Sequence, residues 1–343
     1  MPRHLRFKRH LRFLQEGDVV RVIGDLGDSA TLPAGVAFDH LLAAIRTAPT
    51  AESLTANLAN RLGVTHTLVA ALVDRLSELK LIEYFEPENV HEVRFDRQLL
   101  LFDVLAPVAD HQQSLERQLR LQNANVLILG LGGIGNQVAQ SLAAAGVGSL
   151  VLVDGDIVEE TNLHRQILFR NADVGRPKIS AAYDAILRIA PNCNVIGKNA
   201  FIRSAEDWKA MMTTLPSVAH VMLSADKPVE LVNWLSDARI THGYHFIKCG
   251  YMGTQGLIGP LLGPDTCGYE DLFHSWGNLV ASQPEHIAKF NAESVAPTMA
   301  ASNAILANMA TLELIKHITG AGALSLLEQR LLLDLNDYTT KIG

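Results

Sequence analysis

The hydrophobic pattern of residues 123–343 alternates between short apolar runs and longer amphipathic stretches. The apolar runs typical of buried parallel strands are Val126–Leu129, Leu150–Val153, Val218–Leu223 and Phe246–Lys248. Helical patterns lie at about 134–145, 177–190, 204–214, 229–242 and 297–319, and a last strand pattern at Leu331–Leu335. Residues 263–296 have a loop-like composition. This alternation predicts an α/β domain with a mainly parallel sheet.

Residues 1–88 show a different pattern, which predicts a separate small α+β domain. A β-rich stretch at Val19–Ile23 precedes helical patterns near 36–47, 51–61 and 65–80, and a strand pattern at Leu81–Phe85 closes the unit. In the third helix, with Thr65 as N-cap, one apolar face is predicted to consist of Leu68, Leu72, Val73, Leu76 and Leu79. This order of strands and helices is winged-helix-like, and modules of that shape bind either DNA or peptides. Residues 89–122, with RFDRQ at 94–98 and a helical stretch at 111–122, predict a connector.

Composition narrows the class of protein. With 48% apolar residues, the 343-residue chain is expected to fold around a large core. The net charge of −7 gives no general reason to expect nucleic acid as a partner. No apolar run is long enough for a membrane span, and the basic start MPRHLRFKRHLRF lacks the features of a secretory signal. Three widely spaced cysteines argue against a disulfide framework and favour a cytoplasmic location.

The chemistry-bearing motif is a glycine-rich turn between a strand and a helix. Gly130, Gly132 and Gly135 occupy the three positions of G-x-G-x-x-G, and Asp154 ends the next strand. The first glycine permits the tight turn, the second lets backbone approach phosphate, and the third lets helix and strand pack closely. A carboxylate at Asp154 can accept bonds from ribose hydroxyls. This context predicts a nucleotide site, for NAD as readily as for ATP.

The segment DGDIVEETNLHRQILFRNADVGRPK, residues 154–178, favours ATP. Attack on an α-phosphate needs cations that hold the triphosphate and stabilise the leaving pyrophosphate, whereas hydride transfer does not. Arg165 and Lys178 fit that need, and Asn162 and Gln166 can orient phosphate oxygens. Asp226, which follows a strand in SADKP, is positioned to hold Mg²⁺. Taken singly, these residues also fit a solvated charged face or a helix N-cap.

GLGGIGNQ, DGDIVEETNLHRQ, VGRPK and SADKP together resemble the ThiF/MoeB and ubiquitin-activating superfamily over about residues 92–335. The resemblance implies a Rossmann-like ThiF-type adenylation domain. The whole chain also resembles the microcin-type peptide adenylyltransferases, including the enzymes that mature pantocin precursors. Those carry an N-terminal peptide-clamp domain, a RiPP recognition element, which residues 1–88 match in size and helix order.

The resemblance implies roles residue by residue. ATP and Mg²⁺ would be the cofactors. The nucleotide would be bound by Gly130, Gly132, Gly133, Gly135, Asp154, Asp156, Asn162, Arg165, Gln166 and Lys178. The residues of catalysis would be Arg165, Lys178, Asp226 as the Mg²⁺ ligand, and Arg97. Because the family's RFDRQ-like segment supplies an arginine to the partner subunit's site, Arg97 would act in trans, which implies a homodimer. A surface salt bridge is the alternative for Arg97.

The chain departs from the family's metal and thiol pattern. Of the two CxxC pairs that bind zinc in bacterial relatives, PDTCGYED keeps only Cys267 and has Glu270 at the second position, so no zinc site is predicted. His242, His245 and His274 have no recognisable ligand spacing. A thioester role for Cys267 stays open, whereas Cys249 is expected to pack as a small buried hydrophobe.

These observations predict ATP-dependent adenylation of a carboxylate in a ribosomally made precursor peptide, held through residues 1–88. The carboxylate would be a glutamate side chain or the C-terminus, and intramolecular condensation would follow, in peptide antibiotic biosynthesis. Three alternatives remain: activation of a Gly-Gly-ending sulfur carrier for thiamine or molybdopterin synthesis, NAD-dependent oxidoreduction, and DNA binding by a regulator. The region 65–80 carries few basic groups, which argues against DNA.

Overall fold

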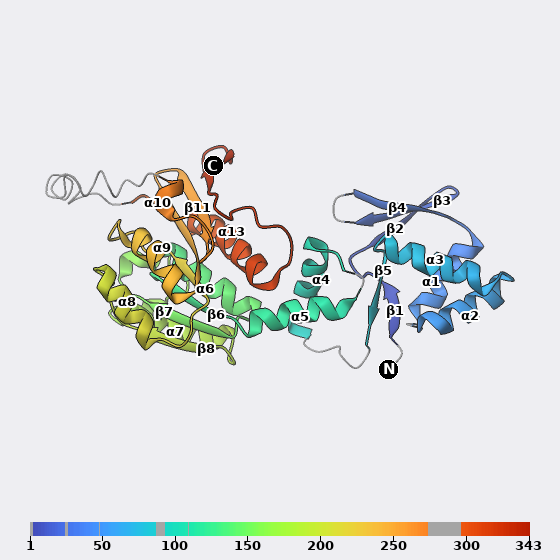
Figure 1. Cartoon of the computed structure of the whole chain (residues 1–343), viewed down its shortest axis with the longest axis horizontal. Helices are drawn as coiled ribbons and strands as arrows, with labels where there is room; N and C mark the ends of the chain where they lie inside the picture. Colours follow the sequence, from blue (N-terminus) through green and yellow to red (C-terminus); the bar gives the residue numbers. More distant parts are fainter. Residues whose placement is uncertain (1–2, 25–26, 48, 87–92, 109, 274–295) are drawn as a thin grey trace. The chain divides into compact units, whose positions relative to one another are not determined.

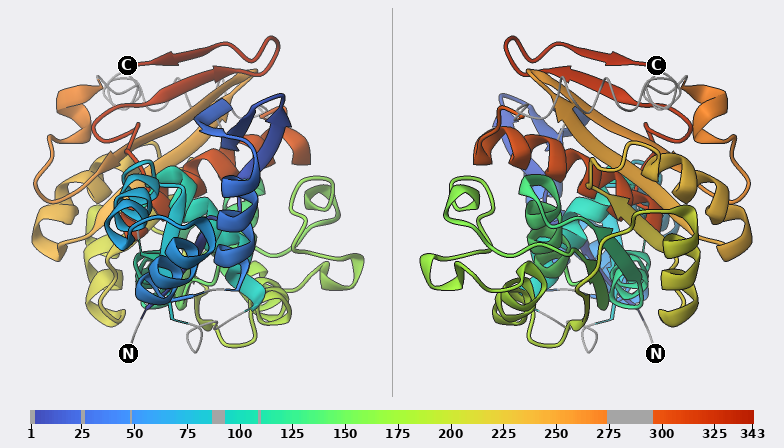
Figure 2. Two further views of the ribbon diagram at one scale, coloured as in Figure 1. Left: turned by 90° about the vertical axis from the view of Figure 1, so that its right-hand side faces the viewer. Right: turned by 90° about the vertical axis from the view of Figure 1, so that its left-hand side faces the viewer.

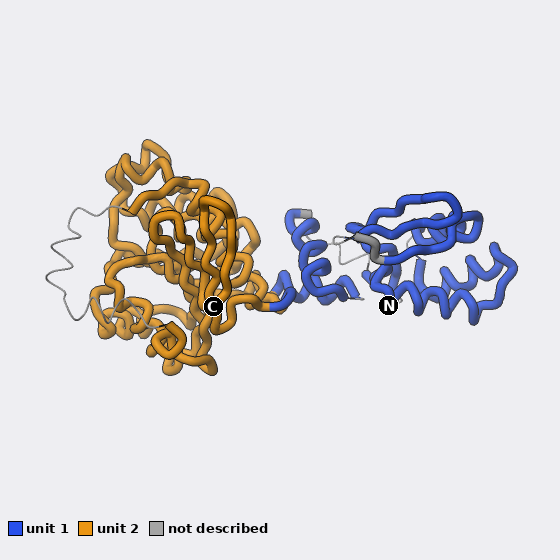
Figure 3. Tube along the Cα trace, turned by 90° about the horizontal axis from the view of Figure 1, so that it is seen from above, with its two compact units in different colours: residues 1–119, 321–323 blue, residues 120–320, 324–343 orange. Residues whose placement is uncertain are grey.

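The computed structural model describes residues 3–24, 27–47, 49–86, 93–108, 110–273 and 296–343. The chain forms two compact units (Figure 3), one of residues 1–119 with 321–323 and one of residues 120–320 with 324–343. The residues predicted to be a connector, 89–122, fall mostly in the first unit. The domain boundaries at 88 and 122 stay predictions.

The first unit (Figure 1) begins with two small antiparallel sheets that pack with the helices α1 (Val36–Arg46), α2 (Ala51–Leu62) and α3 (His66–Glu78). One sheet pairs β1 (His4–Phe7) with β5 (Ile82–Phe85), and the other has the order β2-β3-β4. The strands of the second sheet are β2 (Arg12–Glu16), β3 (Val19–Gly24) and β4 (Gly27–Pro33). One apolar core joins the helices and strands.

Helix α3 begins as predicted and buries most of the predicted face. The Thr65 hydroxyl accepts a hydrogen bond from the amide of Leu68, which is the predicted N-cap. The residues buried in the core are Val69, Val73 and Leu76, while Leu68 is 59% exposed. Most of the predicted face is confirmed: Val73 and Leu76 are buried, and Leu72 and Leu79 are partly buried against the same core. Only Leu68 was wrongly placed on it, because Leu68 and the neighbouring Val69 fit the helical period almost equally well.

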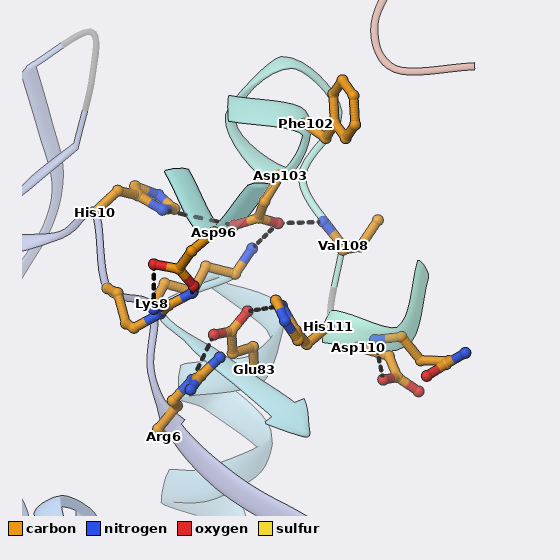
Figure 4. A network of polar contacts seen from close by, with 12 residues as sticks. Arg6, Lys8, His10, Glu83, Asp96, Phe102, Asp103, Val108, Asp110 and His111 are labelled. Carbon is orange, nitrogen blue, oxygen red and sulfur yellow. Dashed lines mark hydrogen bonds and ion pairs between the residues drawn. The ribbon is translucent and has the colours of Figure 1, made fainter. Parts of the chain in front are cut away.

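Buried and half-buried ion pairs hold the segment after β5 to the N-terminal strand (Figure 4). A short 3₁₀ turn, η2 (Val93–Phe95), leads into α4 (Asp96–Leu105), and α5 (His111–Gln122) follows. Lys8 Nζ lies 2.7 Å from Asp103 Oδ1, with both side chains almost fully buried, and Arg9 pairs with Asp96 at 2.6 Å. Burial raises the pKa of Glu83, but the bond from His111 and the charge of Arg6 outweigh it and hold that pKa below its usual range.

The second unit is built on an eight-stranded sheet with the order β13-β12-β11-β10-β9-β6-β7-β8. The five parallel strands are β6 (Asn125–Leu129), β7 (Ser149–Val153), β8 (Asn194–Lys198), β9 (His220–Leu223) and β10 (His245–Met252). The antiparallel extension consists of β11 (Gln255–Leu262), β12 (Leu331–Asp334) and β13 (Thr340–Ile342). This is the predicted Rossmann-like α/β class. Strand β12 coincides with the strand predicted at Leu331–Leu335, whereas the apolar pattern did not predict β8, β11 and β13.

Helices cover both faces of this sheet. One face packs against α6 (Gly133–Ala145), α7 (Lys178–Ile189) and α13 (Ala300–Thr319), and α13 lies along β10 and β11 (Figure 2). The other face packs against α8 (Ala205–Thr214) and α9 (Leu231–His242). Short segments η3 (Glu160–Asn162), η4 (Asn171–Asp173) and α10 (Tyr269–Leu272) complete the unit. Among the described residues, no helix combines the length and apolarity needed to cross a membrane.

The region 263–296, which was predicted to be a loop, is described only in part. The described part, residues 263–273, ends in the short helix α10. Residues 274–295, including His274, lie outside the described residues.

The first unit is expected to be sensitive to the loss of one partner of the buried Lys8–Asp103 pair. Lys8→Ala leaves the Asp103 carboxylate buried without its cation, which is expected to lower the free energy of unfolding by about 3–5 kcal/mol. Urea denaturation of the full chain, followed by circular dichroism, measures the change. The matched control is Arg75→Ala, which removes an ion pair to Glu78 whose side chains are both well exposed. Equal losses in the two variants would contradict the assignment.

Candidate functional site

A cavity of about 890 Å³ opens at the carboxyl ends of the parallel strands. In chain order the parallel strands run 3-2-1-4-5 across the sheet, so the connections after β6 and β9 leave in different directions from adjacent strands. Such a switch point is the usual ligand crevice of an open α/β sheet. The cavity is lined there by residues that follow β6, β7 and β9, and by residues of β10, β11, α10 and β12.

The glycine turn between β6 and α6 allows very close packing. Gly130 has φ +93°, and a Cβ on Gly135 would lie 1.9 Å from the carbonyl oxygen of Gly130, so neither position tolerates a side chain. Gly132 has open space around it and lines the cavity together with Gly133. Gly130 and Gly135 therefore shape the turn, while Gly132 and Gly133 form the wall that a phosphate can approach.

The two aspartates after β7 differ in environment. Asp154 is 9% exposed, and its two oxygens accept hydrogen bonds from the amides of Leu131 (2.6 Å) and Asp156 (2.8 Å). Asp156 lines the cavity, has a half-exposed side chain and accepts a bond from Lys178 Nζ at 2.9 Å. Asp154 thus fixes the glycine turn against β7, and Asp156 is the carboxylate that a ligand can reach.

The structure brings the predicted phosphate-binding residues to one wall of the cavity: Asn162, Arg165, Gln166 and Lys178. Lys178 begins α7, and its side chain is only 7% exposed. Arg165 is half-buried, and one guanidinium nitrogen donates to the Thr161 carbonyl. Gln166 is buried, and its Oε1 atom has no hydrogen-bond partner among the described residues. The cations therefore lie next to polar groups that a phosphate could satisfy.

A second pair of cations, Lys248 and Arg330, lies on the part of the cavity wall formed by β10, α10 and the residue before β12. Lys248 Nζ sits 5.3 Å from the centre of the Tyr269 ring, and the Arg330 guanidinium 4.2 Å from that of Phe273. Burial lowers the pKa of Lys248, the charge of Arg330 lowers it further, and Asp226 opposes both. All five residues line the cavity. Sequence reasoning predicted Asp226 but missed Lys248 and Arg330; a lysine at the end of an apolar strand was the available signal.

Helix α13 also contributes a residue that the sequence analysis missed. Asn303 is fully buried, and its Nδ2 atom occupies the space where a Cβ on Gly133 would lie. Its Oδ1 atom accepts a bond from the Thr298 hydroxyl at 3.1 Å, and Thr298 lines the cavity. Nδ2 has no partner among the described residues. An amide donor is thus available behind the glycine turn.

Arg97 and Cys267 were also considered as functional residues, and neither lines the cavity of the second unit. Arg97 belongs to the first unit, where it is exposed on α4. Cys267 is exposed and absent from the cavity wall, and a bond to Glu328 raises the pKa of its thiol. Cys249 does line the cavity, but burial raises the pKa of its thiol to about 12, so it is a poor nucleophile. As expected from the spacing, all three cysteines are free thiols.

The fold and the site define a Rossmann-type nucleotide-binding protein whose cavity carries cations on two parts of its wall. The chain belongs to the ThiF family, whose model matches residues 96–342.

Curated relatives share part of this sequence. The molybdopterin-synthase adenylyltransferase of Escherichia coli K12 is 42% identical over 116 residues, covering 33% of this chain and 42% of that protein. The adenylyltransferase and sulfurtransferase uba4 of Aspergillus terreus is 44% identical over 153 residues, covering 45% of this chain and 31% of that protein. The matches thus span less than half of the length of either relative.

Solved structures match the fold over nearly the whole chain. The Escherichia coli microcin C7 biosynthetic enzyme MccB in complex with N-formylated MccA has a TM-score of 0.80 at 23% identity, covering 99% of this chain and 96% of that one. PaaA has a TM-score of 0.74 at 22% identity, covering 98% of each chain. At these identities the likeness concerns the fold, including the small N-terminal unit.

Proposed function

We propose that this protein is an ATP-dependent adenylyltransferase that activates a carboxylate of a ribosomally made peptide. One observation carries the proposal: a single cavity has Lys178 and Arg165 beside its glycine turn, and a second pair of cations, Lys248 and Arg330, on the part of its wall from β10 to β12. A triphosphate and a carboxylate are both anions, and the two have to meet for adenylation. ThiF family membership and relatives named as adenylyltransferases support this reading.

The residues at the glycine turn are assigned to ATP. The amides at the start of α6 and the open face of Gly132 receive phosphate oxygens, because free N–H groups and the helix dipole favour an anion there. Asp156 accepts the ribose hydroxyls, while Asp154 holds the turn in place. Lys178 and Arg165 neutralise the charge that develops on the leaving pyrophosphate. Asn162 and Gln166 orient phosphate oxygens.

Asp226 fits a ligand of the Mg²⁺ that accompanies ATP. Its carboxylate is exposed and lies on the cavity wall, three residues after the end of β9. Mg²⁺ is usually held by one or two carboxylates together with substrate phosphates, so a single aspartate is sufficient. The ion supplies further charge neutralisation when bound; the positioning of the nucleotide is carried by the residues named above.

The phosphate assignment predicts a specific kinetic loss. Lys178→Ala and Arg165→Ala are each expected to reduce kcat for pyrophosphate release by about 100–1,000-fold, because each removes a group that stabilises charge in the transition state. The matched control is Arg188→Ala, an exposed cation in the last turn of the same helix as Lys178. Circular dichroism verifies that the variants fold. Wild-type rates in both variants would refute the assignment.

The cations from β10 to β12 are assigned to the acyl substrate. We propose that Lys248 and Arg330 hold the carboxylate that attacks the α-phosphate, which favours a glutamate side chain over a neutral residue. The carboxylate oxygen forms the new bond to phosphorus as the bond to pyrophosphate breaks. An amide nitrogen or carbon nucleophile of the same peptide then displaces AMP. With Cys249 and Cys267 both poorly ionised, direct attack needs no enzyme thioester.

The acyl-substrate assignment is tested by separating the two Michaelis constants. Lys248→Ala is expected to raise KM for a glutamate-containing peptide by about 10–100-fold, the worth of a charged hydrogen bond, and to leave KM for ATP unchanged. Lys209→Ala, an exposed cation on α8, is the control. Because the pKa of Lys248 is lowered, its cation is lost at a lower pH than for an ordinary lysine, so KM for the peptide rises as pH rises through that value. Equal effects on both constants would contradict the division.

The first unit is assigned to capture of the peptide. Its three-stranded sheet has two edge strands, since β2 and β4 each pair only with β3 among the described residues. Strand β2 is largely exposed. An extended peptide can add to such an edge through main-chain hydrogen bonds. The full-length likeness to MccB, determined with N-formylated MccA, supports a peptide over DNA as the partner.

Arg97 is proposed to complete the active site of the partner subunit in a homodimer. The neighbouring Asp96 is held by Arg9 through two bonds of 2.6 and 2.9 Å, which fixes the start of α4 while Arg97 remains exposed. Such an arrangement presents a guanidinium at a defined place on the surface.

Mixing two inactive variants tests this trans role. Arg97→Ala and Lys178→Ala are each expected to be inactive alone, whereas their mixed dimer contains one intact site. An equal mixture is expected to regain about a quarter of wild-type activity if subunits exchange freely. Differently tagged copies verify the exchange. Exchange without any recovery would show that Arg97 does not act across the dimer.

The alternative function is activation of a Gly-Gly-ending sulfur-carrier protein. It is favoured by the 42–44% identity to the molybdopterin-synthase adenylyltransferase and to uba4. That identity covers less than half of this chain, whereas the structural likeness to MccB covers 99% of it. ATP–pyrophosphate exchange with a Gly-Gly-ending carrier, but not with acidic peptides, would favour the alternative.

A further inference from the structure

Three histidines meet at the end of the sheet opposite to the cavity. His220 begins β9, His245 begins β10, and the two are directly paired in the parallel register. His317 lies in the last turn of α13. None of the three lines the cavity, whose residues on the same strands begin at Leu223 and Lys248.

The strand pleat places both strand histidines on the face that α13 covers. Alternate residues of a strand point to the same side, so His220 shares a face with Met222, and His245 shares one with Ile247. Met222 and Ile247 both belong to the core formed with α6 and α13. The fold thus brings residues that are far apart in sequence to one point.

The three imidazoles are close enough to share one ion. One ring nitrogen from each lies within 4.8 Å of the other two. The ring centres are 4.3 Å apart for His245 and His317, 5.4 Å for His220 and His317, and 6.2 Å for His220 and His245. In a tetrahedral zinc site with Zn–N bonds of about 2.0–2.1 Å, ligand nitrogens are about 3.3 Å apart. Small side-chain rotations close the difference.

One ring nitrogen of this cluster is unpartnered within the described part of the chain, and the His245 ring is closely packed. His220 Nδ1 is buried and has no hydrogen-bond partner among the described residues, which is costly unless something binds it. Gly263 leaves the space that the His245 ring occupies, because a Cβ there would lie 2.4 Å from Nε2.

The electrostatic surroundings suit a cation. The three histidines are each half-buried, and a neutral imidazole is the form that binds metal. The carboxylates of Asp265 and Glu313 act on His245 and His317 respectively in the sense that favours positive charge.

We propose that His220, His245 and His317 form a Zn²⁺ site with water as the fourth ligand. The prediction that the chain has no zinc site rested on the missing CxxC pairs; these histidines are widely separated in sequence and show no ligand spacing. Of the histidines considered from sequence, His245 belongs to the site, His242 instead stacks on Tyr244, and His274 lies outside the described residues. The ion would fasten the amino ends of β9 and β10 to α13.

The test measures metal binding directly on the full chain without a polyhistidine tag. The protein is stripped with a chelator, dialysed against Zn²⁺ and analysed by elemental mass spectrometry. One zinc per chain is expected, with a raised thermal unfolding midpoint. Loss of a residue that only hydrogen-bonds to a metal ligand lowers metal affinity by about 10–100-fold. Loss of a ligand itself is expected to cost more, so His245→Gln and His317→Gln should each weaken zinc binding by at least about 100-fold. His242→Gln is the matched control and is expected to bind as wild type.

A second readout keeps the proposal falsifiable if one variant folds poorly. Co²⁺ added to the stripped wild-type protein is expected to give the visible absorption of a tetrahedral site, which three imidazoles and a water produce. Zinc binding that is absent in the wild type, or equal in wild type and both ligand variants, would overturn the proposal. In that case the histidines form only a neutral packed cluster.

Discussion

The close approach of β6 to α6 is the constraint on which the site depends. Gly130 and Gly135 leave no room for side chains between strand end and helix start, and the Asp154 carboxylate holds the turn through the amides of Leu131 and Asp156. Because both oxygens of Asp154 are used in this way, the turn is fixed before any ligand binds. Gly132, Gly133 and Ile134 then line the cavity at the start of α6, where free amides and the helix dipole favour an anion.

The strand order places two groups of cations on different parts of the cavity wall, one near the glycine turn and one formed by Lys248 and Arg330. Strand β9 lies between β6 and β10. The residues after β9 therefore lie between the residues proposed to bind phosphate and the cations Lys248 and Arg330. Asp226 occupies that middle position and opposes the effect of burial and of Arg330 on the pKa of Lys248. Electrostatic interactions are strong in a partly desolvated cavity, so a carboxylate placed between the two cationic groups affects both.

The sequence predicted the fold class and most of the residues proposed to bind phosphate, because both are encoded in continuous stretches of the chain. The glycine turn, Asn162, Arg165, Gln166 and Lys178 lie within one continuous stretch whose period and spacing are directly readable. The residues that were missed, Lys248, Arg330 and Asn303, come from β10, the residue before β12, and α13, and only tertiary packing brings them together. The error at Leu68 in α3 has the same cause, since period alone does not choose between adjacent apolar residues.

Strands β9 and β10 have charged side chains at or just after the carboxyl end of their parallel pairing, and histidines at their amino ends. At the carboxyl ends, the cavity admits solvent and ligand, so Asp226 and Lys248 can remain charged beside one another. At the amino ends, burial against α13 disfavours charge, so His220 and His317 are held neutral. Neutral imidazoles can donate an electron pair to a metal ion, whereas lysine and arginine attract anions. Under the two proposals above, the same sheet would bind anions at the carboxyl ends of its strands and a metal ion at their amino ends.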